Sequence, residues 1–235
     1  MLGKHAHFCG HIISESGRFP KLNEKKVKSL INSYVTQNNI GACYGSLAAG
    51  ADILICEAVI ENNGDIHIIL PFDEKAFIAL SVESAKDNWR ERFSSIFQQA
   101  SSITQVYQKK PIDDSISFAL CTEIAMGSCL FNSGLCDEKP LQLAIWDEEK
   151  TENLAGTFPD LLRWQNLGFE SNYIPSKQAD CIATFLNDQK SDIVELKIQL
   201  TLLDTIYIST LDQLMTFIEQ LPLPLKESTI KIDLD

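Results

Sequence analysis

The stretch YGSLAAGAD, residues 44–52, lies between two apolar segments and decides how the fold is interpreted. Ile40–Tyr44 before it predicts a strand, and Ala49–Asn62 after it predicts a helix. A glycine at such a junction lets a ligand approach the backbone, and the free N–H groups of the helix start favour a negative charge. The same residues suit a tight turn, in which Gly45 permits the turn and Gly50 permits close packing of the helix on the sheet. The sequence leaves both interpretations open.

Outward from this stretch, predicted strands alternate with predicted helices as far as residue 178. The strands are mostly unbroken apolar runs, as in parallel sheets that are covered on both faces. We therefore predict an α/β fold, a Rossmann-like parallel sheet with helices on both faces, over residues 1–178. The predicted strands lie within 5–13, 40–44, 66–70, 103–107, 141–146 and 172–174, and the predicted helices within 23–35, 49–62, 89–100, 115–130 and 160–166.

The remaining residues, 179–235, have a different pattern. Apolar and polar residues alternate over 194–201, an amphipathic helix is indicated over 211–221, and alternation returns at 230–234. This pattern predicts a small C-terminal α+β extension of β-β-α-β order, which would be the start of an output or dimerisation module.

Composition excludes several classes of protein. The chain of 235 residues has a net charge of −12 and no basic cluster, which argues against nucleic acid as a partner. No uninterrupted apolar run reaches the roughly 18 residues that span a bilayer, so no membrane association is expected. The seven cysteines form no CxxC pair, which indicates free thiols, no metal site and a reducing cytoplasm.

Several polar residues follow predicted strands and should meet at one edge of the sheet, because ligands of parallel α/β sheets bind beyond the carboxyl ends of the strands. They are Gly10 and His11, Gly45 and Ser46, Pro71 and Phe72, and Asp147. Arg90, with Arg92, starts a helix beside Trp89 and is the best basic candidate for a phosphate contact.

Acidic residues offer two further hypotheses. Glu57 and Glu123 lie on predicted helices and are the candidate catalytic acids if the chain is an enzyme; otherwise they belong to solvated helix faces. The run 147–149 (DEE) would hold Mg²⁺ or lie at the surface, and the second alternative is the commoner one.

Three ordered motifs carry a resemblance to a known family: FCGH at 8–11, YGSLAAGADILICEAVIENNGDIHIILPF at 44–72 and GTFPDLLRW at 156–164. Together they resemble the SLOG superfamily, which includes Lonely Guy proteins, the Rossmann domain of DNA-processing protein A and nucleotide-sensor domains of bacterial signalling proteins. The sensor domains are the most similar of these. The resemblance covers about residues 5–176 and not the tail.

This resemblance implies a nucleotide-derived ligand over the glycine loop of residues 45–52, with no other cofactor. Combined with the strand-end residues, the predicted ligand-binding set is Gly10, His11, Tyr44, Gly45, Ser46, Gly50, Ala51, Asp52, Pro71, Phe72, Arg90, Gly156 and Thr157.

One departure from the family bears on function. Lonely Guy enzymes carry PGGxGTxxE for cleavage of an N-glycosidic bond, and this sequence has no PGG. We therefore favour binding or sensing of the ligand, coupled to a partner, a second copy of the chain or an output domain. A nucleotide N-glycosidic hydrolase and a protein-interaction module with a vestigial pocket remain as alternatives.

Overall fold

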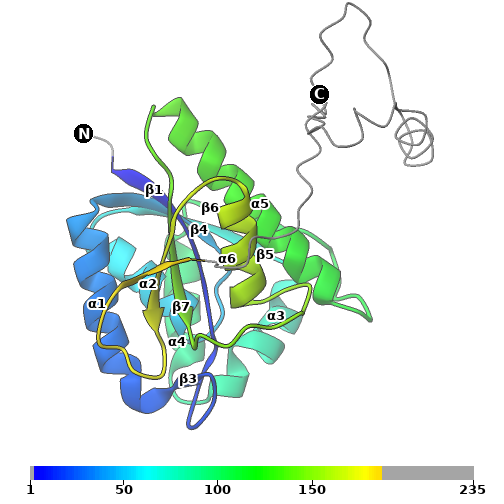
Figure 1. The fold of residues 1–235 in the computed structure, drawn as a ribbon. Coiled ribbons are helices and arrows are strands. Elements are labelled where there is room, and N and C mark those ends of the chain that lie inside the picture. The colour runs from blue at the N-terminus through cyan, green and yellow to red at the C-terminus, as the bar shows by residue number, and fades with distance from the viewer. Residues whose placement is uncertain (1–2, 187–235) are drawn as a thin grey trace, which may run out of the picture. The chain divides into compact units, whose positions relative to one another are not determined.

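The computed structural model describes residues 3–186 (Figure 1), and the predicted extension after Leu186 lies outside this part of the chain. Sheet strands and helices alternate through most of it, joined by short 3₁₀ turns at Lys21–Asn23 and Glu83–Ala85. The strands are β1 (Lys4–Gly10), β2 (Ile13–Ser14), β3 (Phe19–Pro20), β4 (Ile40–Gly45), β5 (Asp65–Leu70), β6 (Ser102–Gln105), β7 (Leu141–Trp146), β8 (Ser171–Pro175) and β9 (Ala183–Phe185). The helices are α1 (Glu24–Gln37), α2 (Ala51–Glu61), α3 (Glu74–Ser81), α4 (Trp89–Gln99), α5 (Ser115–Leu135) and α6 (Thr157–Asn166).

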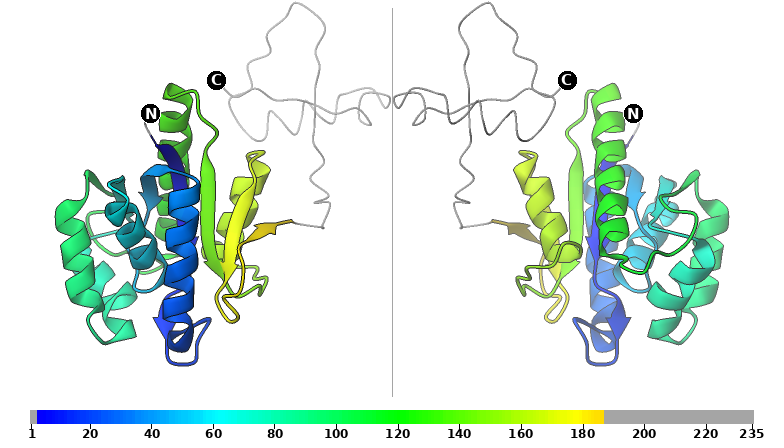
Figure 2. Two further views of the ribbon diagram at one scale, coloured as in Figure 1. Left: turned by 90° about the vertical axis from the view of Figure 1, so that its left-hand side faces the viewer. Right: turned by 90° about the vertical axis from the view of Figure 1, so that its right-hand side faces the viewer.

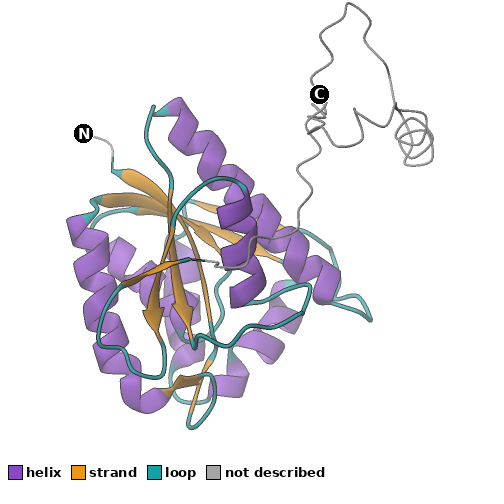
Figure 3. Ribbon diagram, viewed as in Figure 1, coloured by secondary structure: helices purple, strands orange, loops and turns teal. Residues whose placement is uncertain are grey.

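Seven strands form one sheet in the order β6-β5-β4-β1-β7-β8-β9, drawn in orange in Figure 3. All neighbours pair in parallel except β8 and β9, which are antiparallel. The chain builds outward from β1 through β4, β5 and β6, and then crosses to the other side of β1 to add β7 and β8. This is a Rossmann-like α/β sheet, as predicted, and its strand order reverses at β1.

Helices cover both faces of the sheet, as the two views in Figure 2 show. The alternation of side chains along β4 separates the two layers. Cys43 packs in the core that includes α1, α2 and α4, whereas Ala42 and Tyr44 pack against α5 and Trp164 of α6. Both faces of the central strands are therefore buried, which explains why their sequences are continuous apolar runs.

Apart from shifted bounds and the two-residue strands β2 and β3, the structure differs from the predicted elements at four places. Helix α3 is not among the predicted helices; its start is stabilised by Asp73, whose carboxylate accepts a hydrogen bond from the N–H of Ala76 at 3.0 Å. Asn23 precedes α1 as predicted, but its side chain does not cap that helix. It donates instead to the carbonyl oxygens of Ser176 and Lys177 at 3.0 and 2.8 Å. Strand β9 lies beyond residue 178, so the first structural unit extends to Leu186.

The fourth difference concerns α5, which is longer than predicted. It has 21 residues and a mean hydropathy of 1.2 over 18 of them, enough by length and composition to cross a membrane. The helix contains no uninterrupted apolar run, because Thr122, Glu123 and several small polar residues interrupt it. In the fold α5 packs along β1, β4 and β5, which accounts for the apolar residues of its inner face, whereas Ile116, Phe131 and Leu135 are exposed.

Candidate functional site

A cavity of about 520 Å³ lies where the strand order reverses, at the carboxyl ends of β1 and β4. The starts of α2 and α6 and one side of α5 and α3 complete its walls. Phe77, Leu80 and Phe118 form an apolar wall, while Ser46, Asp52, Thr122 and Asp160 supply polar groups. A concave, mostly apolar site with a few convergent polar groups is typical of small-molecule binding.

The structure brings together about half of the predicted ligand-binding residues. Those that line the cavity are Gly10, His11, Gly45, Ser46, Asp52, Gly156 and Thr157. Those outside its lining are Tyr44, Gly50, Ala51, Pro71, Phe72 and Arg90.

Three N–H groups of the loop between β4 and α2 are used within the fold and are not available for the cradle that was one interpretation of its sequence. The N–H of Ala48 donates to the carboxylate of Asp52 at 3.0 Å, and that of Ala49 donates to the carbonyl of Ser81 at 2.9 Å. The N–H of Ala51 donates to the carbonyl of His11 at 3.3 Å. These donors are already satisfied, so this helix start is built for packing.

The glycines of that loop are explained by the same close packing. Gly50 has φ of +105°, and a Cβ there would lie 2.6 Å from the N of Ile13. A Cβ at Gly45 would lie 2.7 Å from the ring of Phe8. Close packing therefore explains both glycines, but only Gly50 needs the backbone freedom of glycine, since Gly45 lies within β4 and has no positive φ.

The start of α6, in contrast, is open and not enclosed by neighbouring segments. Gly156 has φ of +131°, and a Cβ there would meet nothing within 4 Å. Within the described residues, the N–H groups of Thr157 and Phe158 have no hydrogen-bond partner. The buried Oγ of Ser46 has no oxygen or nitrogen partner among residues 3–186, and it interacts with the thiol of Cys121. Of these residues, Ser46 and Thr157 line the cavity, and the free N–H of Thr157 is where a ligand can bond.

Two buried carboxyl groups share the cavity. The pKa of Asp52 is raised to about 7, mainly by burial and in smaller part by the charge of Asp160, against the hydrogen bond from Ala48, which lowers it. Burial also raises the pKa of Asp160 to about 7, against Arg163 and Thr122, which bond it at 3.1 and 3.2 Å. Near neutral pH the pair therefore holds protons that it can donate or exchange.

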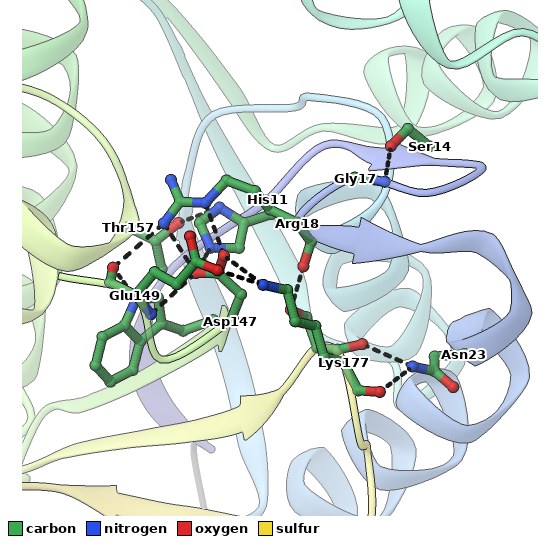
Figure 4. Close-up of polar contacts among 11 residues, drawn as sticks. His11, Ser14, Gly17, Arg18, Asn23, Asp147, Glu149, Thr157 and Lys177 are labelled. Carbon is green, nitrogen blue, oxygen red and sulfur yellow. Dashed lines mark hydrogen bonds and ion pairs between the residues drawn. The ribbon is translucent and has the colours of Figure 1, made fainter. Parts of the chain in front are cut away.

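A chain of polar side chains runs from the cavity to the carboxyl end of β7 (Figure 4). The hydroxyl of Thr157 lies 3.2 Å from Nδ1 of His11, whose Nε2 lies 2.9 Å from a carboxylate oxygen of Asp147. Arg18, from the segment between β2 and β3, donates two hydrogen bonds of 2.9 and 2.8 Å to Asp147. Glu149 joins this group through its backbone.

The order hydroxyl, imidazole, carboxylate resembles a nucleophilic triad, but its electrostatics differ. Burial, together with the charge of Arg18, lowers the pKa of His11 to about 4. Arg18 also neutralises Asp147, whose charge would otherwise stabilise an imidazolium. His11 is consequently a weak base at neutral pH, and the arrangement does not support Thr157 as a nucleophile.

The candidate catalytic acids lie elsewhere, and this corrects the prediction. Glu57, on α2, is bonded by Arg92 at 2.6 and 2.8 Å and by Lys28 at 3.1 Å. Burial alone would raise the pKa of Glu57, but these partners lower it. Glu123 is more than half exposed and faces Arg163 at 3.7 Å. Neither carboxyl lines the cavity. Because of the helical period, Glu57 lies on a different face of α2 from Asp52, and Glu123 lies on a different face of α5 from Thr122.

The hypotheses of a phosphate contact by Arg90 and of a Mg²⁺ site at residues 147–149 are also corrected. Arg90 is largely exposed and pairs with Glu83, away from the cavity. Asp147 is occupied by His11 and Arg18, and within residues 3–186 no cluster of His, Cys, Asp and Glu could hold a metal ion.

Sequence reasoning missed Arg18 and Asp160 as cavity residues. Arg18 had no signal, because it lies in a short loop far from the predicted motifs. Asp160 had one: residues 156–160 read GTFPD, which keeps the spacing of GTxxE with aspartate in place of glutamate. The prediction considered only the missing PGG and not the GTxxE half of the motif PGGxGTxxE.

Taken together, the fold and cavity define a Rossmann-like α/β domain with a small-molecule-sized site at its switch point. No protein-family model matches the chain, and no curated protein matches its sequence. One similar solved structure is the X-ray structure of DNA processing protein A from Streptococcus pneumoniae, with 17% identity and a TM-score of 0.44. The match covers 74% of this chain and 50% of that one, so this chain spans about half its length. The fold assignment itself rests on the strand order of the sheet.

Proposed function

We propose that this domain binds a nucleotide-derived small molecule in the switch-point cavity, as a cytoplasmic bacterial sensor that passes its occupancy to a partner or output domain. The observation that carries the proposal is the open start of α6 on the cavity wall, where Gly156 leaves the approach clear and the N–H of Thr157 has no partner within the described residues. Buried donors without partners cost free energy unless a ligand or water bonds them. The SLOG resemblance supplies the ligand class.

The remaining walls suit the other parts of such a ligand. Phe118 is partly exposed and offers aromatic surface against which a base can pack. Asp52 and Asp160 offer acceptors for sugar hydroxyls. The volume of about 520 Å³ is within the range of ligand pockets.

A second function, hydrolysis of an N-glycosidic bond, is favoured by a separate observation. Asp52 and Asp160 are two buried carboxyl groups in one cavity, each with a pKa raised to about 7. Cleavage of a glycosidic bond uses such a pair, one group as acid and the other as base or nucleophile. In this case Asp160 and Asp52 take the roles that the sequence had offered to Glu123 and Glu57.

A thermal-shift screen with AMP, ADP-ribose, NAD and cyclic dinucleotides tests both functions, with base release followed by chromatography. A ligand at 100 times its dissociation constant stabilises the folded chain by about 2.7 kcal/mol. We expect Ser46→Ala and Asp160→Asn to reduce this shift, and Glu123→Gln, outside the cavity, to leave it unchanged.

The outcomes of this screen distinguish the sensor, the hydrolase and the interaction module. A shift without turnover supports the sensor, whereas a shift with base release that Asp160→Asn abolishes supports the hydrolase. No shift with any probe contradicts both and favours the interaction module with a vestigial pocket.

A further inference from the structure

The Thr157–His11–Asp147–Arg18 chain (Figure 4) has a direction, because each hydrogen bond needs one donor and one acceptor. Arg18 only donates, and it gives two hydrogen bonds to Asp147. Burial would raise the pKa of Asp147, but Arg18 and His11 lower it well below its usual range, so the group is a carboxylate. A carboxylate only accepts, and therefore Nε2 of His11 carries the proton.

The tautomer of His11 then decides the state of Thr157. His11 is neutral above about pH 4, so with Nε2 protonated its Nδ1 has only a lone pair. The hydroxyl hydrogen of Thr157 is directed to this Nδ1 at 3.2 Å. Thr157 is 3% exposed and lines the cavity, so its hydroxyl has only lone pairs left for a ligand.

We propose that the Arg18–Asp147–His11 relay fixes the hydroxyl of Thr157 as a hydrogen-bond acceptor, so that this hydroxyl selects a ligand hydroxyl or amino group over a phosphate oxygen. Asp160, one helical turn further along α6, lines the same cavity. A phosphate oxygen could accept from the backbone N–H of Thr157 but not from its hydroxyl, whereas a ribose hydroxyl supplies the proton that the hydroxyl oxygen of Thr157 accepts. His11, Asp147 and Arg18 are thus positioning residues that act through Thr157. This inference rests on the proposed function and names the ligand group at one wall of the same cavity.

The relay itself is tested on the free protein by ¹⁵N NMR of the histidine rings. The chain has only four histidines, so the variant His11→Gln identifies the signals of His11. We expect neutral His11 with the proton on Nε2 at pH 7. In Asp147→Asn the amide oxygen stays with the charged Arg18 and the amide NH₂ turns to Nε2, which shifts the proton to Nδ1. A wild-type His11 that is protonated on Nδ1, or on both nitrogens, overturns the inference.

The ligand selectivity is tested with AMP and 2′,3′-dideoxy-AMP as probes. We expect the wild type to bind AMP more tightly by about 10-fold or more, as hydrogen bonds to polar and charged acceptors allow. Thr157→Val, which keeps the shape and removes the hydroxyl, should lower this ratio several-fold, and Thr157→Ser should restore it. Asp147→Asn should lower the ratio without touching the cavity wall.

The results that would overturn this inference differ from those that would overturn the proposed function. Equal binding of both probes overturns the inference and leaves the proposed function standing. If neither probe binds, AMP is excluded as the ligand, and the tautomer of His11 decides the relay by itself. Circular dichroism on each variant separates a loss of fold from a change of selectivity.

Discussion

Two helices of this domain start at a glycine with positive φ, yet their N-termini differ in what they can bind. At α2, neighbouring segments consume the N–H groups of Ala49 and Ala51, and Gly50 is enclosed by the backbone of Ile13. At α6, Gly156 is open, and the described residues offer no partner to the first N–H groups of the helix. The difference makes the start of α6 the better candidate for a ligand contact, because a helix start can bind a ligand only through donors that the fold leaves unused.

The largest expected effect on stability comes from adding a side chain at Gly50, the glycine that is enclosed by neighbouring backbone. Gly50→Val puts a β-branched side chain at φ of +105°, with its Cβ 2.6 Å from a backbone nitrogen. We expect a loss of about 4 kcal/mol in the free energy of unfolding, from strain and overpacking together. Urea denaturation measures this loss, and a loss below 1 kcal/mol would show that this junction can relax.

The buried acids should make stability depend on pH in a defined direction. Asp52 and Asp160 have a pKa of about 7 when folded, against 3.8 for the free side chain, so the folded state binds more protons. The stability that each contributes is present below about pH 4 and is lost as the pH rises through 7.

Asp52→Asn keeps an acceptor for Ala48 but cannot ionise. We expect it to raise the free energy of unfolding by about 3 kcal/mol at pH 8 and by much less at pH 5. Denaturation at the two pH values measures the difference. An equal effect at both would show that Asp52 is ionised throughout this range.

Glu57 tests the same comparison, because it lies on α2, the helix whose start is enclosed by neighbouring segments. Removing its carboxylate leaves Arg92, which is 16% exposed at its side chain, with only Glu24 as an acidic partner. We expect Glu57→Ala to cost about 2 kcal/mol of stability and to leave the affinity of any cavity ligand unchanged. A selective loss of ligand binding with unchanged stability would return Glu57 to the site.

The smallest effect on stability is expected at the open glycine. Gly156→Ala meets no neighbouring atom, so it costs only the backbone strain of φ near +131°, about 1–2 kcal/mol. The same change should weaken a cavity ligand strongly, because it displaces the first N–H groups of α6. Ligand titration beside denaturation separates the two effects, and unchanged affinity would mean that the ligand does not use this helix start.

Much of the fold could be predicted, because it depends on local patterns. The strand β7 was predicted with the observed bounds, and β4, α2 and α4 within two residues. Short elements with weak patterns were missed: α3 begins at a polar loop, and β9 has only three residues. The predicted extension over residues 179–235 lies mostly outside the described residues and stays a prediction.

The site was harder to predict, because spacing along the chain does not say which face of a helix meets the cavity. Asp52 and Glu57 lie five residues apart on one helix, yet one lines the cavity and the other binds Arg92. The same holds for Thr122 and Glu123 on α5. An apolar helix such as α2 has no clear amphipathic period from which its faces could be assigned.

The sequence by itself determined the class of this protein: apolar runs of strand and helix length in alternation can bury their surface only as a layered α/β sheet. It also determined that the polar residues after β1 and β4 would meet, since parallel strands end at one edge. Only the tertiary structure decided which of these groups are free. Whether an N–H or a hydroxyl is available to a ligand depends on partners far away in sequence, such as His11 for Ala51 and Asp147 for His11. Hydrogen bonds between distant segments are satisfied only after the sheet and helices have packed, and no local pattern encodes them.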